Sequence, residues 1–190
     1  MKKSGCLVLL VAAAIPGLAP AQEPQERKGF GISFGLGGGS AAVDCSGCDS
    51  DRASGFSGYL RLGGYVRPDL MVAFESNGYT KSSGGYDTNG GFYSVALQWY
   101  PNVETGFYLK GNLGVAAVVE DYDDGDELSV AAAGLGLGLG YDIRLGKNFS
   151  LTPYLNLIYT ANGDVKYNDS STGINAKFNL IQIGLGFTWH

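Results

Sequence analysis

Four charged residues stand inside segments that otherwise alternate between large apolar and small or polar side chains: Arg61, Glu75, Lys110 and Glu120. All four lie on the small and polar side of the alternation. A charge in a narrow, poorly hydrated space is costly unless opposite charges or hydrogen bonds compensate it. We therefore expect Arg61 and Lys110 to pair with Glu75. Polar residues of the same side should complete the hydrogen bonds: Gln98, Asn112, Tyr154 and Gln182.

This expected lumen network suits two roles. Its members could satisfy one another as a plug, which is the interpretation we favour. Alternatively, Lys110 or Arg61 could exchange partners and gate a narrow pore for ions or small solutes.

Two cysteines, Cys45 and Cys48, stand close together in the motif DCSGCD. In an exported protein such a pair predicts a local disulfide. A zinc site would need two further Cys or His ligands, and the only histidine is His190. A redox-active pair would need a setting that lowers a thiol pKa, and the neighbouring Ser, Gly and Asp residues do not supply one.

The densest acidic stretch spans residues 121–127 and holds five carboxylates: Asp121, Asp123, Asp124, Asp126 and Glu127. Carboxylate oxygens on a glycine-containing loop are ligands for calcium or magnesium, although the spacing does not match an EF-hand. A solvated acidic loop is the simpler interpretation, and these residues remain weak candidates for a metal site.

The N-terminal segment is typical of a secretory signal peptide, with Lys2 and Lys3 before an apolar stretch and a cleavage pattern of small residues at 19–21. We predict a signal peptide at 1–21, a short periplasmic lead at 22–27 and a membrane domain at 28–190. No segment has the roughly 20 consecutive apolar residues that a membrane-spanning helix needs.

Strict two-residue alternation, the signature of β-strands, recurs from about residue 30 to the last residues. It is clearest in the final segment, where Ile181, Ile183 and Leu185 alternate with Gln182 and Gly184. Eight such segments of about ten residues each are found, the length at which a tilted strand crosses a bilayer. The sequence thus predicts an all-β fold, an eight-stranded antiparallel up-and-down transmembrane β-barrel.

The connections between these segments alternate in length. Longer ones are expected at 38–54, 78–90, 121–127 and 160–176, and short ones at 66–69, 101–105 and 142–148. In outer-membrane barrels the short turns are periplasmic and the longer loops extracellular. We therefore expect both termini on the periplasmic side and acidic loops outside the cell.

The chemistry of the two columns distinguishes a membrane barrel from a soluble, lipocalin-like one. One column is almost entirely Leu, Ile, Val and aromatic residues, and the other is rich in Gly, Ser, Ala, Asn and Gln. Eight strands enclose only enough space for side chains, so the small column fits the interior and the apolar column fits lipid.

Several short segments carry a resemblance to a known family: LQWYP at 97–101, GFYLKG at 106–111, GLGYD at 138–142, LTPY at 151–154 and GLGFTW at 184–189. The chain beyond residue 21 resembles the small outer-membrane β-barrels that include the OmpA transmembrane domain and OmpX. The resemblance implies a final strand that the barrel assembly machinery recognises. This chain departs from that pattern by ending on His190 after Trp189.

An enzyme that modifies outer-membrane lipid is the main alternative from another class. Such chemistry normally needs an activated nucleophile beside a base. His190 is expected on the periplasmic side, away from the outer leaflet, so we expect neither an enzyme nor a cofactor. The glycine-rich segments 35–39 and 134–140 lack the strand-to-helix context of a nucleotide-binding loop.

These observations together predict a structural or surface-interaction protein of the outer membrane. Its expected partners are membrane lipid, lipopolysaccharide and, during insertion, the barrel assembly machinery. Nucleic acid is not expected, and an extracellular ligand is not identified.

Overall fold

The computed structural model describes residues 27–45, 52–84, 86–122, 125–168 and 170–190. The predicted signal peptide, the lead up to residue 26, Cys48, Asp123 and Asp124 lie outside these residues. Within the described residues, no helix has the length and apolar character needed to cross a membrane.

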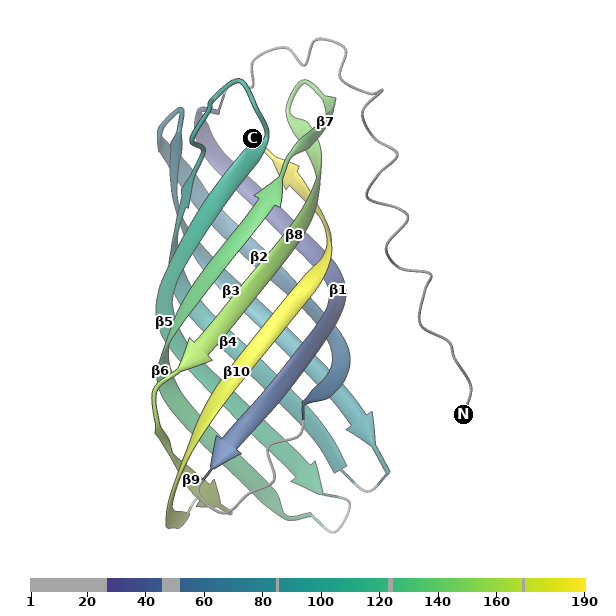
Figure 1. Ribbon diagram of the computed structural model, residues 1–190, viewed down its shortest axis with the longest axis vertical. Helices are drawn as coiled ribbons and strands as arrows, with labels where there is room; N and C mark the ends of the chain where they lie inside the picture. Colours follow the sequence, from purple (N-terminus) through teal and green to yellow (C-terminus); the bar gives the residue numbers. More distant parts are fainter. Residues whose placement is uncertain (1–26, 46–51, 85, 123–124, 169) are drawn as a thin grey trace, which may run out of the picture.

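A closed, tilted antiparallel sheet forms the whole described structure (Figure 1). Its strands are β1 (Gly29–Cys45), β2 (Ala53–Arg67), β3 (Leu70–Ser83), β4 (Tyr86–Trp99), β5 (Phe107–Tyr122), β6 (Glu127–Tyr141), β7 (Ile143–Gly146), β8 (Phe149–Thr160), β9 (Gly163–Tyr167) and β10 (Ser170–Trp189). Strands β1 to β6 pair in sequence, β10 pairs with both β8 and β9, and β1 pairs with β10 to close the barrel.

These ten strands form a ring of eight. β8 and β9 both pair with β6, β8 along Gly134–Gly140 and β9 along Leu128–Val130, so β9 prolongs the line of β8. The short β7 pairs with the beginning of β8 just beyond the end of β6. The predicted eight-stranded antiparallel barrel is therefore confirmed.

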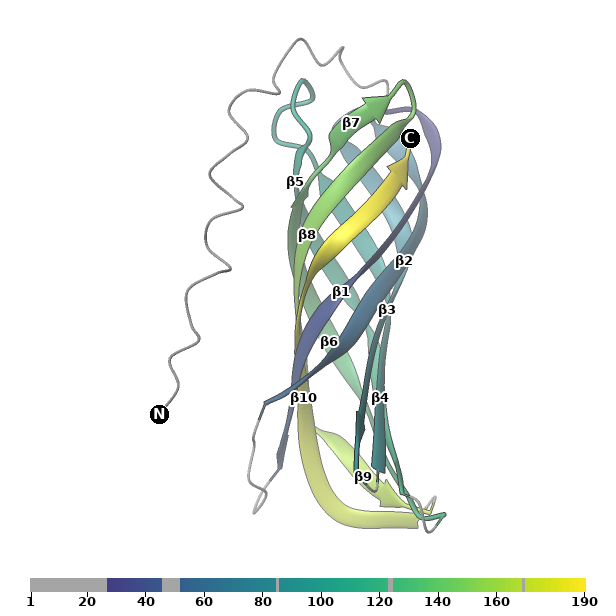
Figure 2. The same ribbon diagram turned by 90° about the vertical axis from the view of Figure 1, so that its right-hand side faces the viewer.

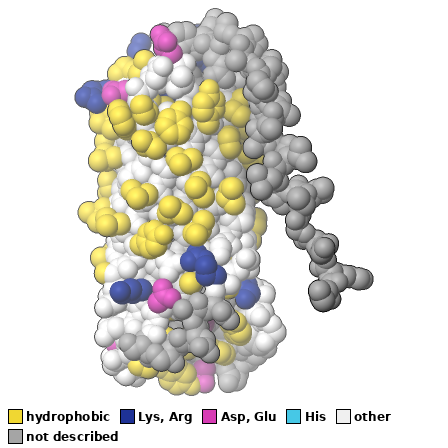
Figure 3. All heavy atoms as spheres, viewed as in Figure 1, with side chains coloured by type: hydrophobic (Ala, Val, Ile, Leu, Met, Phe, Trp, Pro, Cys, Tyr) yellow, Lys and Arg dark blue, Asp and Glu magenta, His cyan; other side chains and the backbone are white. Residues whose placement is uncertain are grey.

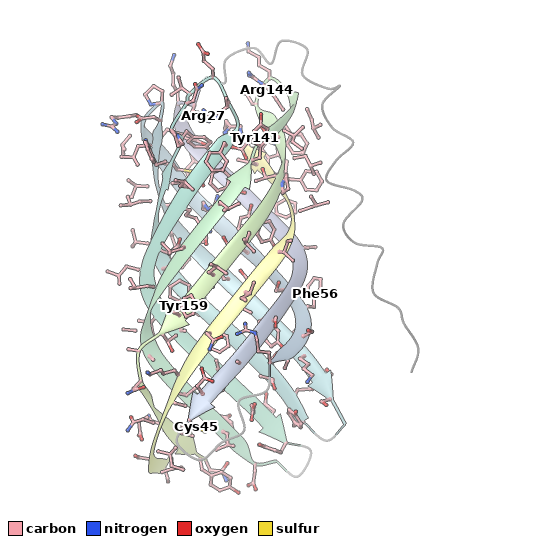
Figure 4. The ribbon with its side chains drawn as sticks, in the orientation of Figure 1. Arg27, Cys45, Phe56, Tyr141, Arg144 and Tyr159 are labelled. Atoms are coloured by element: carbon pink, nitrogen blue, oxygen red, sulfur yellow. The ribbon has the colours of Figure 1, made fainter. Side chains whose placement is uncertain are left out.

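The two ends of the barrel differ. At the end that we call the turn end lie the short connections, β7, Arg27 and His190; the opposite end, where β1 reaches Cys45, is the loop end (Figures 1 and 4). Figure 2 shows the β9–β10 hairpin bending across the loop end.

The expected strand length of about ten residues is wrong. β1 has 17 residues, β5 has 16 and β10 has 20, so most of the expected long loops are strand. Beyond the lipid, water can contact the outer face, so an apolar column is no longer required there. The backbone pairing continues without it, and the hydrophobic alternation therefore underestimates the strands.

The outer surface of the membrane-spanning part is an apolar belt. Figure 3 shows hydrophobic side chains covering the visible face between the turn end and a row of charged side chains nearer the loop end. Leu113, Leu137 and Ile183 are each more than 60% exposed, which is expected only where lipid replaces water. Aromatic rings of Phe34, Phe149, Phe187 and Trp189 pack together near the turn end, as membrane-interface residues do.

Glycine is required where β1 and β10 close the barrel. Gly37 is paired with Gly184, and a Cβ on Gly37 would lie 2.1 Å from the carbonyl oxygen of Ile183. A Cβ on Gly184 would likewise lie 2.3 Å from the carbonyl oxygen of Leu36. The two backbones approach this closely because neither residue has a side chain.

Candidate functional site

The barrel interior is the candidate site, because strand alternation directs its polar residues there. Arg61 on β2 is paired with Glu75 on β3, and Gln98 on β4 is paired with Lys110 on β5. All four are buried, each at 5% exposure or less. Four adjacent strands thus bring their polar residues to one level of the lumen.

Glu75 is the centre of this group. Arg61 Nε donates to Glu75 Oε2 at 2.6 Å, and Lys110 Nζ donates to Oε1 at 2.6 Å. The side-chain amides of Asn77 and Asn112 each donate to Oε1 at 2.9 Å. One carboxylate therefore compensates two buried cations, and we call Arg61, Glu75, Gln98, Lys110 and Asn112 the lumen network.

Aromatic rings border the cations of the lumen network. The Arg61 guanidinium carbon lies 4.9 Å from the ring centre of Tyr59 and 5.6 Å from that of Tyr108. Lys110 Nζ lies 5.6 Å from the ring centre of Tyr59. These contacts stabilise positive charge in a space with little water.

Two predicted members take other positions. Gln182 Nε2 donates to the carbonyl oxygen of Gly78 at 3.0 Å, and its Oε1 accepts from Asn156 at 3.3 Å. The Tyr154 hydroxyl was expected to complete the hydrogen bonds of the charged residues, but it has no hydrogen-bond partner among the described residues. Its ring instead packs edge-on against Tyr59 at 4.7 Å, which directs the hydroxyl toward the glycine-lined wall near Gly184.

A ring of hydrogen bonds that the sequence did not predict runs around the turn-end half of the lumen. Gln98 accepts from Arg61 and donates to the Tyr100 hydroxyl at 2.5 Å. The Tyr100 hydroxyl donates to Asp142 Oδ2 at 2.8 Å, and Thr152 donates to Asp142 Oδ1 at 2.7 Å.

The same ring continues through hydroxyl groups back to β2. Thr152 and Thr188 lie 2.9 Å apart, Thr188 and Ser33 2.9 Å, and Ser33 and Tyr59 2.7 Å, measured between side-chain oxygens. The Tyr59 ring then faces the Arg61 guanidinium. We call this circuit, from Arg61 round to Tyr59, the hydroxyl ring.

Arg27 covers the hydroxyl ring at the turn end. Its guanidinium carbon lies 3.6 Å from the ring centre of Tyr100, and its nitrogens donate to the carbonyl oxygens of Val103 and Thr105 at 3.1 and 2.8 Å. Arg27 precedes the first strand and Tyr100 follows β4, so alternation within strands could not identify either. The sequence feature that could have identified Arg27 and Tyr100 is the presence of charged and aromatic residues beside the expected short turns.

His190 also lies in the turn-end mouth. Its Nδ1 lies 2.8 Å from the Tyr65 hydroxyl and its Nε2 lies 3.0 Å from Ser150 Oγ. Burial lowers the His190 pKa, an effect that the nearby Asp142 carboxylate partly opposes. These contacts fix the chain after β10 against β2 and β8.

The combination of Ser150, His190 and Asp142 does not form a catalytic triad. In a triad the acid and the serine contact opposite nitrogens of the imidazole. Here Asp142 Oδ2 lies 3.8 Å from Nε2, the same nitrogen that contacts Ser150, and Tyr65 occupies Nδ1. Ser150 is fully buried, so no substrate reaches its hydroxyl.

On the loop-end side of the lumen network, the interior becomes apolar. Phe92, Ile158, Phe178 and Leu180 are buried together across the lumen, and we call them the apolar floor. Gly134 and Gly136 make room for the Phe92 ring, because a Cβ at either would lie 3.1 to 3.3 Å from it. The sequence-based expectation of a small and polar interior therefore holds only for the turn-end half.

On the loop-end side of the apolar floor lies a cavity of about 540 Å³ that opens toward the loop end, and we call it the cup. Glu120, the fourth inward charge, lines the cup and takes no part in the lumen network; the Tyr122 hydroxyl donates to it at 3.4 Å. Arg52, Lys81 and Thr88 also line the cup.

The described carboxylates of the acidic stretch, Asp121, Asp126 and Glu127, lie where β5 ends and β6 begins. Tyr167 and Asn168 donate hydrogen bonds to the Asp126 carboxylate, and these bonds, that of Tyr167 first, lower its pKa. Asp121 is paired with Glu127 in the strand register. Among the described residues, no group of three or more acidic, His or Cys side chains could hold a metal ion.

Cys45, at the end of β1, is disulfide-bonded. Its predicted partner Cys48 lies outside the described residues, so the pairing stays a prediction.

Solved structures of small outer-membrane barrels share this fold at low sequence identity. The chain is 16% identical to Neisserial surface protein A, with a TM-score of 0.60 over 84% of this chain and 96% of that one. It is 17% identical to Ail, the attachment invasion locus protein of Yersinia pestis, with a TM-score of 0.50 over 85% and 99%. For OprG from Pseudomonas aeruginosa the identity is 16% and the TM-score 0.50, over 88% and 100%.

No curated protein matches the chain in sequence. The family model described as "Outer membrane protein beta-barrel domain" matches residues 6–188, nearly the whole sequence. The chain therefore belongs to the outer membrane protein β-barrel domain family.

Proposed function

We propose that this protein is a non-conducting outer-membrane barrel that presents an acidic surface to the cell exterior, with a structural or surface-interaction role. The observation that carries the proposal is the Glu75-centred lumen network together with the hydroxyl ring. The two groups take side chains from seven of the eight barrel lines, all except β6, and from both sides of the lumen.

Closure of the lumen follows from how tightly these groups compensate one another. An ion passing Glu75 would have to displace Arg61 or Lys110, each of which would then be a buried, unpaired charge. Breaking a buried pair of this kind costs about 3–5 kcal/mol. The apolar floor is a second barrier, because a bare ion gains no ligands from Phe92, Ile158 or Leu180.

The charge distribution supports an orientation with both ends of the chain in the periplasm. Acidic residues predominate at the loop end: Asp44, Asp87, Glu120, Asp121, Asp126, Glu127 and Asp164 stand there against Arg52, Lys81, Lys166 and Lys177 among the described residues. At the turn end basic residues outnumber acidic ones: Arg27, Lys28, Arg67, Arg144 and Lys147 stand there against Asp69, Glu104 and Asp142. In outer-membrane barrels short turns face the periplasm.

The partners in this proposal follow from the surface. Lipid and lipopolysaccharide contact the apolar belt, and the barrel assembly machinery handles the strand that ends at Trp189. The acidic loop end suits cationic molecules or cationic segments of other proteins by charge complementarity.

Single-channel recording of the refolded protein in a planar bilayer tests the closure. We expect no conductance steps from the unaltered barrel. The variant Arg61→Ala/Glu75→Ala/Lys110→Ala/Phe92→Ala removes all three charges and opens the apolar floor, and it should conduct if it folds. Steady conductance from the unaltered protein would instead establish a narrow channel for ions or small solutes.

Protease treatment of intact cells tests the orientation. Trypsin should cleave after Lys166 or Lys177 at the loop end and leave Arg144 and Lys147 uncut until the outer membrane is opened. Cleavage at Arg144 in intact cells would show that the short turns face the cell exterior, contrary to the proposed orientation.

A further inference from the structure

The cup at the loop end has the form of a small-molecule site. Its volume of about 540 Å³ lies within the range of roughly 300–1,000 Å³ that is typical of ligand pockets. Its wall is mostly apolar and includes Val43, Tyr79, Val118, Val130 and Phe178. The β9–β10 hairpin contributes Ile174, and Figure 2 shows it crossing this end of the barrel.

An apolar wall at this place is unexpected for a vestibule that only holds water. Inward-facing residues on the turn-end side include many Ser, Thr, Asn, Gln and charged residues beside Tyr rings and the buried Met71, Ala73 and Ala96. Those that line the cup are mostly Ala, Val, Leu, Tyr and Phe, with a minority of polar and charged residues. Apolar surface that remains in contact with water is unfavourable and commonly marks a binding site. The apolar floor ends the cup, so a molecule that enters from the loop end meets a closed base.

The rim of the cup carries a row of polar groups on three neighbouring strands. Lys81 on β3 is paired with Thr88 on β4, which is paired with Glu120 on β5, and all three line the cup. No ion pair or hydrogen bond joins the Lys81 ammonium to another residue of the described part of the chain. Arg52 adds a second cation to the lining and bonds to Ser40 and Asn179.

The acidic character of the loop end does not extend to the inside of the rim. Asp44, Asp87 and Asp121 are exposed and stand next to inward-facing residues in the alternation, so they face outward. Of the described residues that line the cup, two are cations and one, Glu120, is a carboxylate. The inner rim therefore favours a negative group close to Lys81, although the outer surface is acidic.

We propose that the cup binds an amphiphile that has an unbranched apolar chain and a carboxylate head group. The chain lies against Val118, Val130 and Phe178 with its end toward the apolar floor. The carboxylate pairs with Lys81 and accepts a hydrogen bond from Thr88. This site is separate from the lumen network, so the experiments on the cup do not depend on whether the lumen is closed.

Photo-crosslinking with laurate that carries a diazirine at its terminal carbon tests the site on the full chain in lipid nanodiscs. Crosslinks mapped by mass spectrometry should fall on cup residues near the floor, such as Phe178 and Val118. Val130→Trp, which fills the cup, should remove these crosslinks while the barrel keeps its heat-dependent gel migration. Crosslinks restricted to lipid-facing residues such as Leu113 and Val115, unchanged by Val130→Trp, would overturn the proposal.

Competition against the same probe tests the head group and the chain. Laurate should compete better than dodecanol or dodecyltrimethylammonium, and each methylene from octanoate to laurate should tighten binding about fourfold. Lys81→Gln should weaken laurate about tenfold without changing dodecanol. The matched control is Lys177→Gln, an exposed lysine on the outward side at the same end, which should change neither. Equal competition by all three head groups, or equal effects of the two lysine variants, would refute the role of Lys81.

Discussion

Lys110 Nζ lies 2.6 Å from Glu75 Oε1 although the two residues stand on β5 and β3, with β4 between them. Arg61, by contrast, reaches Glu75 from the directly paired position on the neighbouring strand. Glu75 therefore links three strands of the wall through charge, and Gln98 of β4 joins through Arg61. Ion pairs and hydrogen bonds between side chains therefore connect the strands across the interior, in addition to the backbone hydrogen bonds of the sheet.

Removing the Glu75 carboxylate should destabilise the barrel more than any single change at its surface. Glu75→Ala leaves Arg61 and Lys110 buried without their anion, and the expected loss is about 3–5 kcal/mol in the free energy of unfolding. Urea titration in lipid vesicles, followed by gel migration, measures this loss. Glu104→Ala, in an exposed turn, is the control and should be neutral. If Glu75→Ala were as stable as the control, the lumen network would contribute nothing.

Breaking the hydroxyl ring should have a smaller effect that is localised at the turn end. Asp142→Ala removes the acceptor of both Tyr100 and Thr152, although Gln98 and Thr188 still contact the two hydroxyl oxygens. Each buried donor that loses its acceptor costs about 1–3 kcal/mol. Hydrogen exchange should rise first in β7 and the beginning of β8. Uniform exchange across the barrel in Asp142→Ala would mean that the ring has no local role. Asp69→Ala, at a neighbouring turn, provides the comparison.

Two adjacent glycines of β1 offer a matched steric test. Gly37→Ala places a methyl group against the backbone of Ile183 and Gly184 and should cost about 1–3 kcal/mol through strain at the closing seam. Gly38→Ala meets open space on the outer face and should be tolerated. The urea midpoints of unfolding of the two variants, measured in the same lipid, should differ, with that of Gly37→Ala lower. Equal midpoints would show that the backbone where β1 meets β10 can relax around the added methyl group.

Stability should fall on mild acidification because of His190. Its pKa is lowered in the folded barrel by burial, with Asp142 opposing this and Arg27 and Arg144 adding to it. Below the unfolded value of about 6.5 the unfolded chain therefore binds more protons than the folded one. The contribution of neutral His190 is complete above that pH and is lost as the pH falls through the folded pKa. His190→Gln should flatten this part of the stability profile, and an unchanged slope between pH 7 and 5 would assign it to other groups.

The sequence could predict the strands and the centre of the lumen because both depend on alternation next to lipid. Leu135, Leu137 and Leu139 must face outward, which turns the intervening glycines inward, and the same rule places Arg61, Glu75 and Lys110 on the inside. Only one carboxylate among these inward residues lies near both cations. The alternation pattern is therefore sufficient to predict that Arg61 and Lys110 pair with Glu75.

Other features depend on contacts that alternation does not encode. Tyr100 and Asp142 follow the ends of β4 and β6, where the position of a side chain is set by the turn. The cup lies largely where the outer face is no longer apolar, so hydrophobic alternation does not predict strands for much of its wall. Tyr154 is buried inside the barrel, but its packing on Tyr59 decides where the hydroxyl points, and alternation does not encode that packing.

The distance between Lys110 Nζ and the Glu75 carboxyl group in lipid is the most direct test of the closed lumen. Solid-state NMR with ¹⁵N-labelled lysine and ¹³C-labelled glutamate can measure it, with Lys110→Gln assigning the signal. The structure predicts a strong dipolar coupling from direct contact, since the nitrogen lies 2.6 Å from Oε1. A folded barrel in which this coupling is absent would contradict the account, because the carboxylate would not then hold the two cations across the lumen.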